Sequence, residues 1–258
     1  MSEGAVSGSA AAFFDLDRTL MAGSSGLHWA RAAYRAGLVG RRQLASDGWA
    51  NVKFRLRGST DKETEAVKDR LGEFLEGRRV KDLERLGHQV LAGVLPRIYE
   101  RMLQTAYDHQ DEGRRVYICT AATQDMADTL AHVLGFDGAA GSRLGKRDGF
   151  YTGRFDGPFC YGEGKPVRMR EIAERDGLDL AQSWAYSDSA SDLPMLRAVG
   201  HAVVVNPDPE LTRVAREEGW DVMRFETLGR RLKIGAAVLA AAAAGGASAN
   251  TRRATRRR

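Results

Sequence analysis

The sequence predicts an α/β fold built on a mostly parallel β-sheet. Short apolar runs alternate with amphipathic helical patterns along the chain, which is typical of sheets whose strands are joined by helices. The chain has 258 residues, of which 43% are hydrophobic and 28% charged. This composition is that of a globular protein with a sizeable core, and it excludes collagen-like, mucin-like and wholly disordered chains.

Apolar runs predict five strands: Ala11–Phe14, Val116–Cys119, Trp184–Ser187, Ala202–Val205 and Val222–Phe225. Helices with recognisable ends lie between them. The three predicted helices are Gln124–Leu134, Pro166–Asp176 and Pro209–Glu218. The last two begin with proline and glycine follows each of the three, which are the placements that helix starts and ends favour. The Asp148-Gly149 pair predicts a hairpin turn within Arg143–Arg154.

The interval between the first two strands is much longer than the roughly dozen residues that a parallel crossover needs. Its patterns are helical. Thr60 and Glu63 form a capping box that begins one helix. The apolar face of this helix and two further apolar repeats at helical spacing are Val67, Leu71, Phe74 and Leu75; Val80, Leu83, Leu86 and Val90; and Ile98, Met102 and Ala106. We therefore expect a helical insert over residues 24–95 that caps a site, with an extra layer of core as the alternative.

Asp15, Asp17 and Thr19 form a D-x-D-x-T motif directly after the first strand. Two carboxylates two residues apart at a strand end can face one pocket, where one attacks phosphorus and the other handles the leaving-group proton. An acidic turn is the alternative interpretation of this motif alone.

Asp188 and Asp192 follow the Trp184–Ser187 strand. This spacing suggests a magnesium site, because Mg²⁺ takes one or two protein carboxylates together with phosphate oxygens and waters. Asp192 also precedes Leu193-Pro194, so a helix N-cap is the alternative.

Thr120 ends the Val116–Cys119 strand, and its hydroxyl could bind phosphate; closing a strand is the alternative role. Lys165 stands at the start of a helix, where a cation is disfavoured unless a negative group lies nearby. Ligands of open α/β sheets bind outside the carboxyl ends of the strands, so all four motifs are expected in one crevice.

The motif order, from Asp15 and Asp17 through Thr120 and Lys165 to Asp188, resembles the haloacid dehalogenase superfamily. The resemblance is closest to subfamily IB, the phosphoserine phosphatase-like branch, and covers roughly Ala11 to Phe225. It implies a Rossmann-like parallel sheet with a helical C1-type cap inserted after the first strand. The core domain is expected over residues 10–23 and 96–228, the cap over 24–95, and a tail over 229–258.

The resemblance also implies a magnesium-dependent phosphatase with a two-step mechanism. Asp15 is the expected nucleophile and Asp17 the general acid and base. Mg²⁺ is expected on Asp15, the backbone carbonyl of Asp17 and Asp188. Thr120 and Lys165 are expected to hold the phosphoryl group, with Thr19 and Asp192 in supporting roles.

Asp17 supplies the acid that transport ATPases and dehalogenases of this superfamily lack, whereas phosphotransferases keep it. Phosphoserine phosphatases carry a substrate-reading glutamate nine residues after the nucleophile, where this chain has Ser24. The expected substrate is a small phosphorylated metabolite, with phosphoserine and histidinol phosphate as candidates. A phosphotransferase, a membrane-associated lipid-phosphate phosphatase and a scaffold protein stay open as alternatives.

The net charge of +5 is concentrated in the tail. Eight Lys and Arg residues and no acids lie in 230–258, which leaves 31 basic against 34 acidic residues in 1–229, a net charge of −3. We therefore expect no nucleic-acid partner. Two cysteines and an N-terminus unlike a signal peptide favour the cytoplasm. The alanine-rich Ile234–Ala249 segment is predicted as a helical or disordered tail, with weak contact to anionic lipid as the alternative.

Overall fold

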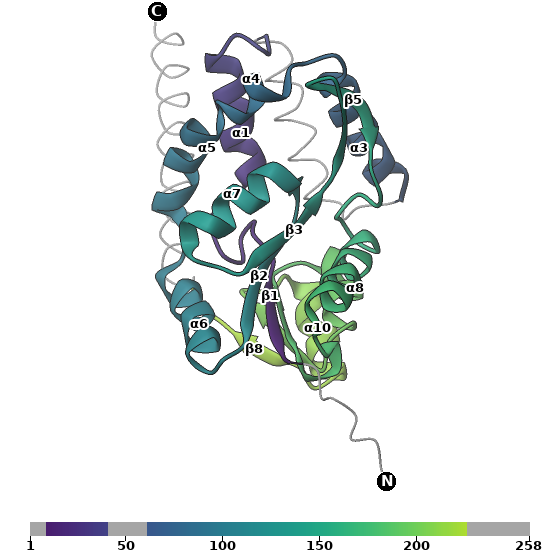
Figure 1. Ribbon diagram of the computed structural model, residues 1–258. Helices are drawn as coiled ribbons and strands as arrows, with labels where there is room; N and C mark the ends of the chain where they lie inside the picture. Colours follow the sequence, from purple (N-terminus) through teal and green to yellow (C-terminus); the bar gives the residue numbers. More distant parts are fainter. Residues whose placement is uncertain (1–8, 41–60, 226–258) are drawn as a thin grey trace, which may run out of the picture. The chain divides into compact units, whose positions relative to one another are not determined.

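The computed structural model describes residues 9–40 and 61–225. Its main sheet has six strands in the order β3-β2-β1-β6-β7-β8 (Figure 1). The strands are β1 Ala11–Phe14, β2 Arg115–Thr123, β3 Gly138–Ser142, β6 Trp184–Ser187, β7 His201–Val205 and β8 Asp221–Met223. β1 pairs in parallel with β2 and β6, and the β2–β3 and β6–β7 pairs are parallel too. The predicted α/β class with a parallel sheet is confirmed.

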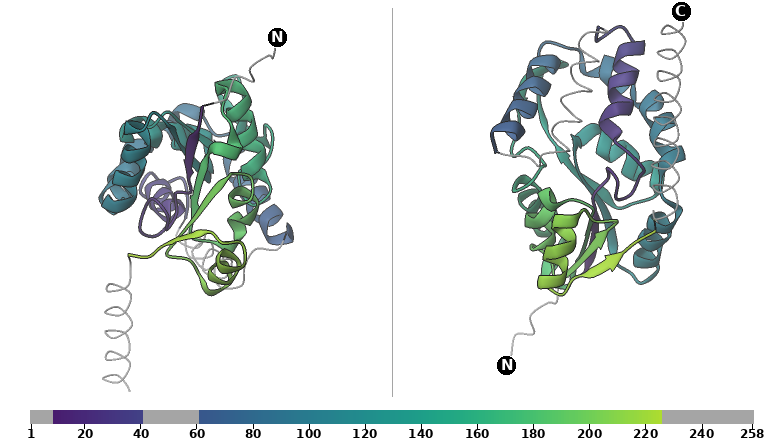
Figure 2. Two further views of the ribbon diagram at one scale, coloured as in Figure 1. Left: turned by 90° about the horizontal axis from the view of Figure 1, so that it is seen from below. Right: turned by 180° about the vertical axis from the view of Figure 1, so that it is seen from behind.

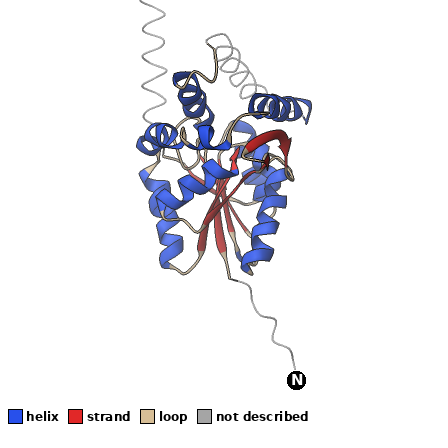
Figure 3. Ribbon diagram, turned by 45° about the horizontal axis from the view of Figure 1, so that its top comes forward, coloured by secondary structure: helices blue, strands red, loops and turns tan. Residues whose placement is uncertain are grey.

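The central strand β1 is buried on both faces, which explains why it is apolar throughout rather than alternating. Phe13 packs in one buried cluster with Met169 of helix α8 (Gly164–Asp176). Phe14 points to the other face, where its ring contacts His109 of helix α6 (Glu100–Asp111). Figures 1 and 2 accordingly show α6 and α8 on opposite faces of the sheet, and Figure 3 shows helices flanking the strands on both sides.

The helices around the sheet are α6 Glu100–Asp111, α7 Gln124–Leu134, α8 Gly164–Asp176, α9 Leu193–Leu196 and α10 Pro209–Glu217, with short 3₁₀ turns at Leu180–Gln182 and Ala190–Asp192. The predicted end of α7 is confirmed, because Gly135 takes a left-handed φ of 71°. The largest differences from the predicted strands are in β2, β3 and β8. β2 covers Arg115–Thr123 rather than Val116–Cys119 and so contains Thr120, β3 was not predicted, and β8 covers Asp221–Met223 rather than Val222–Phe225.

The segment between β1 and β2 is helical where the structure describes it. It holds α1 Ser25–Arg35, α3 Asp61–Leu75, α4 Val80–Glu84, α5 Gly87–Val94 and the 3₁₀ turn Leu95–Arg97. The apolar repeat from Val80 to Val90 spans two short helices rather than one. Thr60, the predicted capping residue, lies outside the described residues.

A hairpin from beyond β2 packs against this helical segment. Its strands are β4 Leu144–Arg147 and β5 Phe150–Phe155, and the turn between them has Asp148 at φ 52° and Gly149 at φ 82°. This geometry confirms the predicted turn. The hairpin shares an apolar cluster with α3 and α4: Leu75, Val80, Leu83, Leu144 and Tyr151.

Residues 1–222 form one unit, and residues 223–258 form a second that lies almost wholly outside the described residues. The alanine-rich segment falls in that undescribed part. Within residues 9–40 and 61–225, no helix is both long enough and apolar enough to cross a membrane.

Candidate active site

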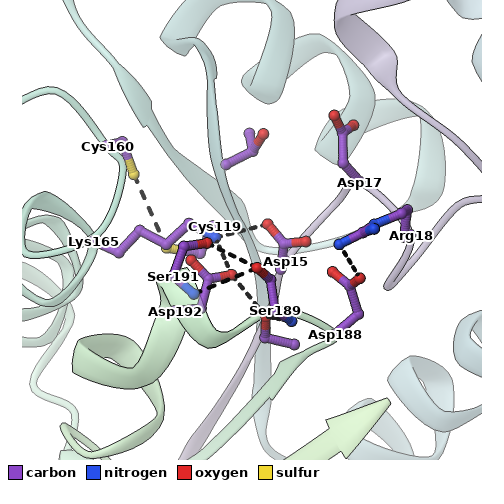
Figure 4. A network of polar contacts seen from close by, with 12 residues as sticks. Asp15, Asp17, Arg18, Cys119, Cys160, Lys165, Asp188, Ser189, Ser191 and Asp192 are labelled. Atoms are coloured by element: carbon purple, nitrogen blue, oxygen red, sulfur yellow. Dashed lines mark hydrogen bonds and ion pairs between the residues drawn. The ribbon is translucent and has the colours of Figure 1, made fainter. Parts of the chain in front are cut away.

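The carboxyl ends of the parallel strands bring the predicted side chains together (Figure 4). Asp15 follows β1, Thr120 lies within the longer β2, and Asp188 follows β6. All three are buried. Parallel neighbours end at the same edge of a sheet, so residues more than 100 positions apart in the sequence meet there.

Lys165 joins two of the acids. Its Nζ donates to Asp15 Oδ1 and to Asp192 Oδ2, each at 2.7 Å. The lysine side chain is only 2% exposed. The structure thus supplies the negative partners that the unfavourable position of Lys165, at the start of α8, led us to expect.

Asp192 does not use its side chain as a helix cap. It occupies the N-cap position of α9, but its carboxylate makes no capping hydrogen bond there among the described residues. Its Oδ2 accepts instead from Lys165 and from Ser187 Oγ, both at 2.7 Å. The carboxylate therefore holds Lys165 in place.

Burial controls the electrostatics of this cluster. It raises the pKa of Asp15 to about 7, an effect that Lys165 opposes and that the charge of Asp192 reinforces. Burial by itself lowers the pKa of Lys165, but Asp15 and Asp192 outweigh that effect and raise it well above its ordinary value. The ammonium is thus retained between two acids.

Asp188 lies at the other side of Asp15 and pairs with Arg18, whose Nη2 is 2.6 Å from Asp188 Oδ2. Burial raises the pKa of Asp188 to about 8, Arg18 opposes this rise, and the charge of Asp15 adds to it. The two carboxylates therefore favour additional positive charge at this edge of the sheet. Arg18 itself has a left-handed φ of 66°, a conformation that side chains other than glycine rarely adopt.

The donor set fits a hard divalent cation. Asp15 and Asp188 offer carboxylate oxygens, the ligands that Mg²⁺ prefers, in a buried site with excess negative charge. Thr19 Oγ1 is fully buried in the same loop and has no hydrogen-bond partner among the described residues. Within the described ranges, there is no group of three or more His, Cys, Asp or Glu side chains that could hold a metal ion. An Mg²⁺ ion here would therefore need ligands beyond these two carboxylates, such as backbone, water or phosphate oxygens.

Asp17 is held by the start of helix α1. Ser24 Oγ donates to its Oδ2 at 2.9 Å, and the Ser25 backbone N–H donates to its Oδ1 at 2.7 Å. Thr120 Oγ1 accepts from the Ala122 backbone N–H at 3.3 Å. In Figure 4, Asp17 lies on one side of Asp15 and Lys165 on the other.

Sequence reasoning predicted Lys165 in the site but missed three other partners of the acids. These are Ser187, Arg18 and Ser24, and each contacts a predicted site residue. Ser187 and Arg18 are adjacent in sequence to Asp188 and Asp17, and this adjacency was the available signal. Nothing in the sequence alone links Ser24 to Asp17.

Comparisons with known proteins agree with this geometry. Residues 12–197 match the family of haloacid dehalogenase-like hydrolases. A Mycobacterium tuberculosis protein named phosphoserine phosphatase SerB1 is 38% identical over 228 residues, which cover 88% of this chain and 74% of that protein. A histidinol-phosphatase of Neisseria meningitidis is 29% identical over 220 residues, which cover 83% of this chain and 98% of that protein.

Among solved structures, a Bordetella pertussis protein of unknown function has a TM-score of 0.74 at 26% identity, covering 84% of this chain and 99% of that one. The structure of a phosphoserine phosphatase with a phospho-aspartyl intermediate analogue has a TM-score of 0.60 at 21% identity, covering 88% of this chain and 99% of that one. At this level of identity the likeness supports the fold alone.

The chain belongs to the haloacid dehalogenase-like hydrolase family. Within that family it is similar to phosphoserine phosphatases, as the motif order led us to expect.

Proposed function

We propose that this hydrolase is a phosphatase that cleaves phosphomonoesters through a phosphoryl group carried on Asp15. The observation that supports this most strongly is the buried pair of Lys165 and Asp15, joined at 2.7 Å. A lysine held at that distance from a carboxylate can neutralise phosphoryl oxygens at the moment the carboxylate attacks. An acidic turn has no need of such a lysine.

In the first step a carboxylate oxygen of Asp15 attacks phosphorus, and the bond from phosphorus to the substrate oxygen breaks. Asp17 donates a proton to that leaving oxygen, because an alkoxide is a poor leaving group. Lys165 and the hydroxyl of Thr120 hold the phosphoryl oxygens during the transfer. Asp192 keeps Lys165 in position through their 2.7 Å contact.

In the second step Asp17, now ionised, takes a proton from water, and the resulting hydroxide attacks the phosphorus of the aspartyl-phosphate. The P–O bond to Asp15 breaks, phosphate leaves, and both carboxyl groups return to their starting states. Asp15, the backbone carbonyl of Asp17 and Asp188 would hold Mg²⁺. That ion would supply the positive charge that lets an anionic carboxylate approach an anionic phosphate.

The proposed substrate class is a small phosphorylated metabolite. Relatives named for phosphoserine and histidinol phosphate support this class without selecting between those two compounds. A phosphotransferase would use the same first step with an alcohol in place of water. The proposal keeps the division into a core (10–23 and 96–228), a cap (24–95) and a tail (229–258). It also keeps a cytoplasmic location, with weak lipid contact by the tail as the alternative.

Hydrolysis of p-nitrophenyl phosphate with Mg²⁺ or with EDTA tests the proposal, with Asp15→Asn as the comparison. We expect release of phosphate by the wild type only when Mg²⁺ is present, and loss of at least about 1,000-fold in Asp15→Asn. A panel with phosphoserine, histidinol phosphate and lysophosphatidic acid then ranks substrates. Equal inactivity of wild type and variant throughout would favour the scaffold alternative.

A further inference from the structure

We propose that Ser24 is a positioning residue for Asp17: together with the first backbone amide of helix α1, its hydroxyl fixes the carboxyl plane of the proton donor. The inference rests on the proposed function, because it concerns the proton that Asp17 delivers. It assigns a role in the reaction to the start of α1, which lies in the helical segment inserted after β1.

Both oxygens of Asp17 are fixed from one side. Ser24 Oγ donates to Oδ2 at 2.9 Å, and the Ser25 N–H donates to Oδ1 at 2.7 Å. Ser24 and Ser25 are 7% and 8% exposed, so bulk water competes little for these contacts. Two donors on two oxygens determine the tilt and the rotation of a carboxyl group, which a single hydrogen bond does not.

The hydroxyl of Ser24 is not occupied with an ordinary helix cap. Ser24 is the N-cap residue of α1, where a serine side chain usually accepts from an amide two or three residues later. Here no such capping bond forms among the described residues, and the hydroxyl donates to Asp17 instead. Asp17 in turn accepts from an N–H at the positive end of the helix.

The two contacts differ in what they allow during proton transfer. A backbone N–H can only donate, so Asp17 Oδ1 serves as an acceptor, and Oδ2, which faces the Ser24 hydroxyl, is the better position for the proton. A serine hydroxyl can donate or accept, and it can rotate when a proton arrives on Oδ2. As the bond from phosphorus to the leaving oxygen breaks, that proton passes from Oδ2 to the leaving oxygen, and the Ser24 hydroxyl again donates to the carboxylate.

The entry and exit of the inserted segment are paired, which fixes where α1 begins. The Ala22 N–H donates to the Arg97 carbonyl at 2.8 Å, and the Tyr99 N–H donates to the Leu20 carbonyl at 2.8 Å. Ser24, the N-cap of α1, therefore lies only two residues beyond a backbone contact between the two ends. The position of the Ser24 hydroxyl is set by this pairing as well as by α1 itself.

Leaving-group dependence tests the role, because a proton donor matters most for poor leaving groups. The experiment compares kcat/KM for phenyl phosphate and p-nitrophenyl phosphate with Mg²⁺, two substrates of similar shape whose leaving groups differ in basicity. This parameter covers the steps up to loss of the leaving group, so hydrolysis of the intermediate does not affect it. We expect Ser24→Ala to lower the value for phenyl phosphate at least about tenfold and that for p-nitrophenyl phosphate less than about threefold.

Three further variants separate positioning from folding. Ser24→Thr keeps a hydroxyl and should restore most of the selectivity. Ser25→Ala keeps the backbone N–H that contacts Asp17. The ratio of its kcat/KM values for the two substrates should therefore match the wild-type ratio. In an Asp17→Asn background, addition of Ser24→Ala should change the ratio no further, because the proton donor is already gone. Thermal melts establish that each variant is folded.

Equal losses on both substrates in Ser24→Ala, or a further change of the ratio in the double variant, would overturn the inference while leaving the proposed function intact. A wild type that hydrolyses neither substrate with Mg²⁺ would refute the proposed function and the inference together.

Discussion

Lys165 and Asp15, 150 positions apart in the sequence, form a buried ion pair with 2.7 Å between Nζ and Oδ1. The same ammonium is 2.7 Å from Asp192 Oδ2, so one cation serves two buried acids. Buried pairs of this kind cost much to break, because the remaining charge has neither water nor a partner. We therefore expect loss of this pair to lower the stability of the protein as well as its activity.

Replacement of Lys165 by Met should lower the free energy of unfolding by about 3 kcal/mol, because Asp15 and Asp192 lose their shared counter-charge. It should also abolish phosphatase activity. Urea denaturation in EDTA measures the stability. Lys146→Met is the matched control, since Lys146 pairs with Asp125 at 2.7 Å on the surface and should contribute less than about 1 kcal/mol. Similar losses in the two variants would contradict the account.

The turn before Lys165 depends on a glycine. A Cβ on Gly164, the first residue of α8, would lie 1.8 Å from the carbonyl oxygen of Phe159, so the backbone must shift. We expect Gly164→Ala to displace Lys165 and to lower kcat on the order of 100-fold. Gly87→Ala is the control, because Gly87 begins α5 with open space around it. Full activity in Gly164→Ala would show that Lys165 tolerates displacement.

The loop that carries Asp17 has a strained residue at Arg18, whose φ is 66°. Arg18→Gly and Arg18→Ala both remove the ion pair with Asp188, but only glycine adopts this φ without strain. The Gly variant should therefore be more stable than the Ala variant by about 1 kcal/mol. Chemical denaturation of the two variants side by side measures the difference. Equal stabilities would indicate that the loop relaxes to another conformation.

His109 predicts a pH dependence of stability outside the site. Its Nδ1 accepts from Arg114 Nε at 2.6 Å, so the ring is neutral and its Nε2 donates to the Tyr186 hydroxyl at 2.8 Å. Burial and, to a smaller extent, Arg114 lower its pKa to about 4, whereas an unfolded histidine titrates near 6.5. Between these values the unfolded state binds more protons, so stability falls as the pH decreases from 6.5 to about 4.

We expect this loss to be on the order of 2 kcal/mol for His109 and to be absent in His109→Gln. The measurement compares the free energy of unfolding at pH 7 and pH 4.5 for wild type and variant. Identical pH dependence in the two proteins would mean that His109 takes up its proton as easily when folded as when unfolded.

Much of this fold follows from local sequence. The β1, β6 and β7 strands are apolar runs with a buried environment, and glycine ends α7 as expected. Gly138–Ser142 escaped prediction because Gly, Ala and Ser have low strand propensity, and this strand forms through its pairing with β2. Tertiary pairing of this kind has no local signal.

The site shows the same division. The positions of Asp15 and Asp188 follow from strand ends, whereas Thr120 lies inside β2, which continues to Thr123. The unfavourable place of Lys165 at a helix start indicated a negative partner. The identity of that partner depends on the packing of α8 against the sheet. The contact of Ser24 with Asp17 depends likewise on where α1 begins, which no spacing in the sequence determines.

The central claim is that Asp15 carries the phosphoryl group, and acid-quenched peptide mass spectrometry tests it most directly. In Asp17→Asn, p-nitrophenyl phosphate needs no proton donor for the first step, whereas hydrolysis of the intermediate loses its base. We expect the peptide that contains Asp15 to gain one phosphoryl group in this variant and none in Asp15→Asn. Turnover of p-nitrophenyl phosphate by the wild type with no phosphoryl group on that peptide in Asp17→Asn, or turnover that persists in Asp15→Asn, would contradict the account.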